Sequence, residues 1–110
     1  MRRVLAALAL ATLPAPLLAA DGALACFAAG QKPPEVISAC TAALGSGLAA
    51  DTRILALLAR ADAYAATKDL AAARHDFDAV LRLAPSHTGA LLGRARINEA
   101  EGKPQAAEAD

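Results

Sequence analysis

The sequence predicts an all-α fold, built as a short array of antiparallel helical hairpins. Hydrophobic residues make up 56% of the 110 residues but aromatic residues only 3%, so alanine and leucine supply most of the apolar mass. Both are strong helix formers, whereas the residues that favour strands are scarce. The segment Leu57-Leu58-Ala59-Arg60-Ala61 also recurs as Leu91-Leu92-Gly93-Arg94-Ala95. An offset of about 34 residues, as between these two segments, is typical of stacked helical hairpins.

Residues 1–20 have the three parts of a Sec-type signal peptide. A short basic region, Met1-Arg2-Arg3, precedes an apolar segment without charge, and Leu18-Ala19-Ala20 supplies small residues for a signal peptidase. We expect cleavage after Ala20 and export to the periplasm or the medium. The alternative is a membrane anchor, but the apolar segment is short for a span of about 20 residues. We therefore expect no transmembrane span in the mature chain.

The charge balance argues against a nucleic-acid partner. The whole chain has 11 basic and 11 acidic residues, and removal of Arg2 and Arg3 leaves nine basic residues against 11 acidic ones. Proteins that bind nucleic acids need a basic patch or stripe to neutralise phosphates. No nucleic acid is therefore expected among the partners.

Two helices are predicted in residues 54–87, with a break at Lys68-Asp69. Asp69 is placed to cap the second helix from Leu70 onward. Pro85 ends that helix at Ala84, because proline has no backbone N–H to donate and restricts the residue before it. On each helix, large and small apolar residues recur at spacings of three and four, which places them on one face.

The same residues resemble the tetratricopeptide repeat family. The family alternates large residues with small ones that let the paired helices approach, and it closes each unit with proline. The matching positions are Leu57, Ala61, Tyr64, Ala73, Phe77 and Pro85. Arg60 departs from the pattern, since the family often has leucine there. The resemblance implies a TPR-like α-solenoid with one complete unit at residues 54–87.

Two incomplete units are predicted on either side. Residues 21–53 would form a degenerate hairpin, with a short helix around Ala23 to Ala29. A second helix would start at Pro33 and end at Gly45-Ser46-Gly47, and a loop from Gly45 to Asp51 would follow. Residues 88–110 would form a truncated unit, with a helix from Gly89 to Glu101 and the start of another from Gln105 to Asp110.

The two cysteines, Cys26 and Cys40, fall on the two helices of the first predicted hairpin. An exported protein with an even number of cysteines usually contains disulfides, and antiparallel helices could bring this pair together. Two alternatives remain. The residues could stay buried thiols, or Cys26 could be lipidated, because Ala23-Leu24-Ala25-Cys26 is similar to a lipoprotein box.

No catalytic or metal site is apparent, so we expect neither an enzyme nor a cofactor. His75 and His87 have no metal-ligating residue four positions on, and both are interpreted as surface residues. The run Arg74-His75-Asp76 is assigned to the solvent side of its helix. Asp78 has arginines four positions before and after it, Arg74 and Arg82, and these charges are interpreted as a solvated helix face.

The family resemblance implies binding on a concave face, lined by the first helix of each unit. The residues at these positions are Leu55, Leu58, Asp62, Ala65, Leu92 and Arg96. We expect the partner to be a peptide or a protein. Self-association is an alternative, because the truncated C-terminal unit would leave Leu91, Leu92 and Ile97 with little cover. The chain could also be a lipid-anchored structural protein or a fragment of a longer repeat protein.

Overall fold

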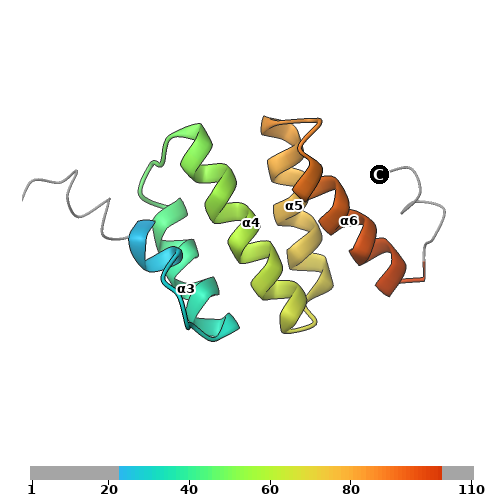
Figure 1. Ribbon diagram of the computed structural model, residues 1–110, viewed down its shortest axis with the longest axis horizontal. Helices are drawn as coiled ribbons and strands as arrows, with labels where there is room; N and C mark the ends of the chain where they lie inside the picture. Colours follow the sequence, from blue (N-terminus) through green and yellow to red (C-terminus); the bar gives the residue numbers. More distant parts are fainter. Residues whose placement is uncertain (1–22, 103–110) are drawn as a thin grey trace, which may run out of the picture.

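The computed structural model describes residues 23–102 and shows helices side by side in chain order (Figure 1). A helical turn at residues 23–26 precedes four longer helices, and this part of the chain contains no strand. The prediction of an all-α fold is confirmed for these residues. The predicted signal peptide and the predicted helix start from Gln105 to Asp110 lie outside the described residues. The four helices are α3 (Pro33–Leu44), α4 (Ala50–Ala66), α5 (Leu70–Leu83) and α6 (Thr88–Ala100).

Consecutive helices run antiparallel, and each packs against the next (Figure 1). In addition, α4 contacts α6 directly, two helices further along the chain. The turns after these two helices share an unusual backbone conformation, because Lys68 has φ 66° and Gly102 has φ 74°. The left-handed conformation is uncommon for a residue with a side chain. Lys68 and Gly102 occupy equivalent positions in the repeat, so the sequence period has a counterpart in the backbone.

Local capping explains where the last two long helices begin. The Asp69 carboxylate accepts a hydrogen bond from the Ala72 N–H at 3.2 Å, as predicted. The interpretation of His87 as a surface residue is wrong. His87 is half-buried, and its Nδ1 accepts a hydrogen bond from the Ala90 N–H at 3.2 Å, which satisfies one of the free donors at the start of α6.

Two boundaries differ from expectation. The first helix was expected to reach Ala29, but the chain leaves the helical conformation at Phe27, where the hydrogen bond is to the carbonyl only three residues back. The Gln31 side chain then donates to the carbonyl of Ala25 at 2.6 Å. At the other boundary, α4 already starts at Ala50, within the expected loop. Alanine favours helix, and Asp51 in the first turn interacts favourably with the helix dipole.

The core divides into two clusters that meet at α4. The larger one contains most of the residues that resemble the repeat signature, with Ala61 and Ala73 fully buried and Phe77 2% exposed. Tyr64 packs against it half-buried, whereas Pro85 is exposed. Small side chains at the two alanines let α4 and α5 approach, which leaves the aromatic rings to fill the remaining space. The smaller cluster joins Cys26, Cys40, Ala43 and Ala56.

The predicted disulfide between Cys26 and Cys40 is confirmed. Both residues are buried, so the bond forms part of the smaller core cluster. Its formation excludes lipidation of Cys26 in this structure, because the sulfur already has its second covalent partner. It equally excludes two free thiols, and the described residues contain no free cysteine.

Gly93 on α6 lies directly against the Phe77 ring of α5. A Cβ atom on residue 93 would overlap with the ring of Phe77, which leaves no room for a side chain. Phe77 is 2% exposed and belongs to the larger core cluster, so its ring cannot move aside freely. Residue 93 corresponds to Ala59 at the repeat offset, but in α6 this position has to be glycine.

We expect Gly93→Ala to destabilise the fold despite the better helix propensity of alanine. Overpacking typically costs about 1–3 kcal/mol, and the gain in propensity is at most about 1 kcal/mol. Urea unfolding followed by circular dichroism measures the difference. Gly45→Ala is the matched control, since residue 45 has φ −77° and a Cβ there meets only ordinary contacts at 3.5 Å. Equal stability of both variants would contradict the close contact.

Candidate interaction surface

The residues predicted to line the concave face lie on α4 and α6, and we call them the α4/α6 strip. They are Leu55, Leu58, Asp62 and Ala65 on α4, and Leu92 and Arg96 on α6. Their spacing of three and four residues places each set on one side of its helix. Direct contact between the two helices brings the sets together.

The strip exposes two large apolar side chains. Leu55 is 56% exposed and Leu92 is 50% exposed, one on each helix. In contrast, Leu58 and Ala65 are partly buried and pack against the larger core cluster. The strip therefore has an apolar floor that belongs to the core and two leucines that extend from it. Exposed leucines of this kind are the contacts that a partner would cover.

Asp62 and Arg96 carry the charges of the strip. They occupy equivalent positions in the repeat, one on α4 and one on α6. Burial raises the pKa of the Asp62 carboxyl, and the positive charge of nearby Arg96 partly offsets this rise. The two groups are thus close enough to interact, but they are not within ion-pair distance in the described part of the chain. Both charges remain available to a partner.

The expected lack of cover at the C-terminal unit holds only for Leu92. Ile97 is 3% exposed and belongs to the larger core cluster, and Leu91 is half-buried. The expectation for Ile97 was wrong because α6 packs this side chain toward α4 and α5 rather than leaving it at the array end. The apolar surface of α6 is consequently concentrated on the strip.

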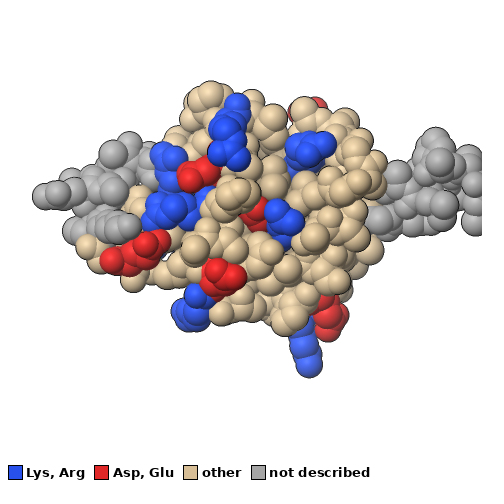
Figure 2. Space-filling model, turned by 180° about the vertical axis from the view of Figure 1, so that it is seen from behind, with Lys and Arg blue, Asp and Glu red and all other residues tan. Residues whose placement is uncertain are grey.

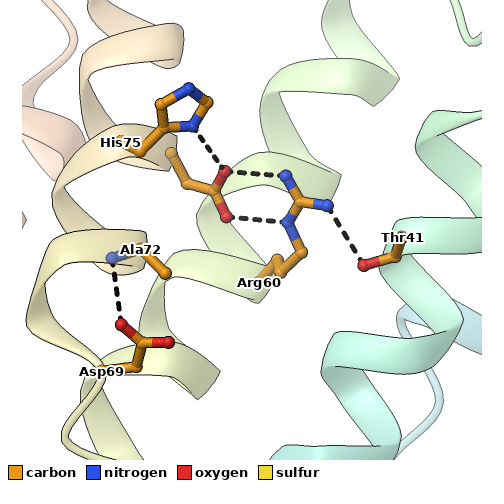
Figure 3. Close-up of polar contacts among 6 residues, drawn as sticks. Thr41, Arg60, Asp69, Ala72 and His75 are labelled. Carbon is orange, nitrogen blue, oxygen red and sulfur yellow. Dashed lines mark hydrogen bonds and ion pairs between the residues drawn. The ribbon is translucent and has the colours of Figure 1, made fainter.

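A buried ion pair joins three helices, and the sequence analysis did not find it. Arg60 on α4 donates from Nε and Nη2 to the two carboxylate oxygens of Asp76 on α5, each at 2.8 Å (Figure 3). It also donates from Nη1 to the Thr41 hydroxyl on α3 at 3.1 Å. The Asp76 side chain is 1% exposed and that of Arg60 is 17% exposed. The assignment of Asp76 to the solvent side was therefore wrong.

The surroundings of Arg60 stabilise its charged form. Hydrogen bonding to Asp76 raises the pKa of Arg60 above its ordinary value, and desolvation opposes this rise. The guanidinium also lies 5.8 Å from the centroid of the Tyr64 ring, within the range of a cation–π interaction. His75 is mostly exposed, and its Nδ1 is 3.7 Å from Asp76 (Figure 3). This arrangement orients helices, because the three hydrogen bonds of Arg60 end on side chains of α3 and α5.

Two of the charges on α5 that were interpreted as a solvated helix face pair with residues beyond that helix. Arg74 pairs with Glu101 at 2.6 Å, and Asp78 pairs with Arg94 at 3.1 Å, so both bonds run from α5 to the region of α6. Basic and acidic side chains are interspersed over the face seen in Figure 2. Spacing along α5 did not indicate these pairs, because the partners Arg94 and Glu101 come from another part of the chain.

The described residues offer no metal site, since they contain no group of three or more histidine, cysteine or acidic side chains that could hold an ion.

A second apolar area lies at the N-terminal end of the described chain. There Leu24 and Phe27, 67% and 43% exposed, border a hollow of about 510 Å³ beside Leu48. Every residue that lines it is uncharged, and Thr52 supplies the one side-chain hydroxyl among them.

Within residues 23–102, no helix has both the length and the apolar character needed to cross a membrane. Comparisons of the chain with protein-family models, curated proteins and solved structures found no match.

Proposed function

We propose that the chain is an exported, tetratricopeptide-like interaction module that binds a protein or peptide through the α4/α6 strip. The observation that carries this proposal is the pair of exposed leucines, Leu55 and Leu92, beside two unpaired charges on adjacent helices. Interfaces combine apolar contacts that exclude water with charges that select the partner. The disulfide is in keeping with export, because such bonds persist in oxidising compartments.

The strip also supports binding rather than chemistry. Its ionisable groups are one carboxylate and one guanidinium, without a nucleophile or a histidine beside them. The Arg60–Asp76 pair, which is the most organised polar group in the described residues, points into the protein and fixes α3, α4 and α5. A rigid set of helices is what a preorganised binding surface requires.

We expect Leu92→Asp to abolish capture of the partner, since it places a charge within the apolar contact. The measurement is crosslinked capture from periplasmic extract with the mature chain, followed by titration of the purified partner. Leu83→Asp is the matched control, because Leu83 is 47% exposed but lies on α5. Unchanged affinity of Leu92→Asp, or an equal loss with Leu83→Asp, would rule out the strip. Leu58 is unsuitable for this test because it packs against the core.

A further inference from the structure

The strip repeats its apolar residue and reverses its charge between the two helices. Leu58 and Asp62 on α4 correspond to Leu92 and Arg96 on α6 at the offset of the repeat. Asp62 lies near Arg96 where α4 contacts α6, and the repeat offset places Leu58 and Leu92 one turn before these charges on their respective helices. This pattern is complementary to itself. A half-turn about an axis that lies between α4 and α6 and runs parallel to them places α4 of one copy opposite α6 of the other.

We propose that the α4/α6 strip docks on the same strip of a second copy of this chain, with Asp62 of each copy facing Arg96 of the other. Leu58 of each copy then faces Leu92 of the other, so the apolar contacts coincide as well. This inference rests on the proposed function, since it names the partner for the same surface. The arrangement is isologous and closes after two copies.

Charge complementarity distinguishes this occupant from others. Within one copy, Asp62 and Arg96 are near each other but form no ion pair, and neither has another charged partner in the described residues. Docking about the proposed axis surrounds each charge with two of opposite sign. A docking mode that set Asp62 against Asp62 would instead bring like charges together, which is strongly disfavoured. One relative orientation of the two copies is therefore selected.

The test is a charge exchange followed by sedimentation analysis of the mature, disulfide-bonded chain. When two copies of Asp62→Arg dock, the two arginines of one copy face the two arginines of the other. When two copies of Arg96→Asp dock, two aspartates face two aspartates in the same way. We expect the self-association of each variant alone to be weaker than that of the wild type by a factor of roughly ten or more. An equimolar mixture of the two recovers association, because each arginine then faces an aspartate. The double variant Asp62→Arg/Arg96→Asp recovers it within one chain.

Net charge needs its own control, since the two single variants also differ in overall charge. Arg82→Asp on α5 changes the net charge as Arg96→Asp does, and Arg82 is exposed and lies on another helix. We expect Arg82→Asp to self-associate as strongly as the wild type does. A mixture of Arg82→Asp with Asp62→Arg should associate more weakly than the mixture of Arg96→Asp with Asp62→Arg. Circular dichroism confirms that each variant is folded.

Two results would overturn the inference. One is a wild-type chain that stays monomeric at its highest soluble concentration. The other is a mixture of Asp62→Arg and Arg96→Asp that associates no better than either variant alone. Neither result affects the proposed function, which fails separately if Leu92→Asp still captures a different protein at unchanged affinity. The two proposals can thus be told apart.

Discussion

Replacement of Arg60 by methionine should destabilise the fold by about 3–5 kcal/mol, the usual effect of removing one partner from a buried ion pair. The Asp76 carboxylate is 1% exposed and would lose both of its 2.8 Å hydrogen bonds to the guanidinium. Thr41 would lose its contact as well, which loosens α3 from the other two helices. Urea unfolding of the oxidised chain, followed by circular dichroism, measures the free energy of unfolding.

The double variant Arg60→Met/Asp76→Leu is the informative control. It removes both charges and leaves apolar side chains that fill similar space, a replacement that is often neutral or even stabilising. We therefore expect it to be considerably more stable than Arg60→Met alone. If the free energy of unfolding of Arg60→Met were within about 1 kcal/mol of the wild-type value, the pair would not hold the three helices together as described.

Loss of the disulfide should have the second-largest effect. The cysteines are 14 residues apart, and closing a loop of this size stabilises a fold by about 3 kcal/mol in the entropy model. Among residues 23–32 only Cys26 is buried, so the bond is also the main attachment of this segment to α3. We expect Cys26→Ala/Cys40→Ala to unfold at lower urea concentration, with faster hydrogen exchange in residues 23–32.

The same experiment separates the disulfide from general packing. Reductant should lower the stability of the wild type toward that of the double alanine variant and leave the variant itself unchanged. Amide hydrogen exchange in α5, which is far along the chain from the bond, should become faster only by the amount that the loss of global stability accounts for. A wild type whose unfolding is insensitive to reductant would contradict a stabilising role for the bond.

The sequence was sufficient for features that depend on neighbours along the chain. Helix composition, the capping of α5 by Asp69 and the burial of Phe77 all follow from local spacing and side-chain chemistry. The disulfide could be predicted as well, because an even cysteine count and an expected hairpin limited the possible partners. Each of these inferences used one helix, one turn or one hairpin at a time.

Features that depend on a neighbouring helix were missed. Asp76 lies between a histidine and the buried Phe77, and its polar neighbours suggested a solvent position. Its partner Arg60 is 16 residues away and belongs to another helix. A usable signal was present, since Asp76 is three residues after Ala73 and four before Val80, on the stripe that faces the core. Only a polar partner on α4 makes that position acceptable for a carboxylate.

The position of Gly93 shows the same limit. Its place in the repeated segment was visible, but the reason for glycine was not, because the Phe77 ring that occupies the space comes from the preceding helix. The charges on α5 were likewise interpreted as a solvated helix face, whereas Asp78 pairs with Arg94 on α6. Local rules describe the helices, and packing between helices decides which side chains are left for binding.

Site-specific photo-crosslinking in intact cells tests the central claim most directly. A photoreactive side chain is placed at Leu92 on the strip or at Leu83 on α5, two sites of nearly equal exposure. If the α4/α6 strip is the binding surface, residue 92 crosslinks to a second copy or to another protein, and residue 83 does not. Crosslinks from residue 83 alone, or equally from both sites, would contradict the assignment of binding to this strip.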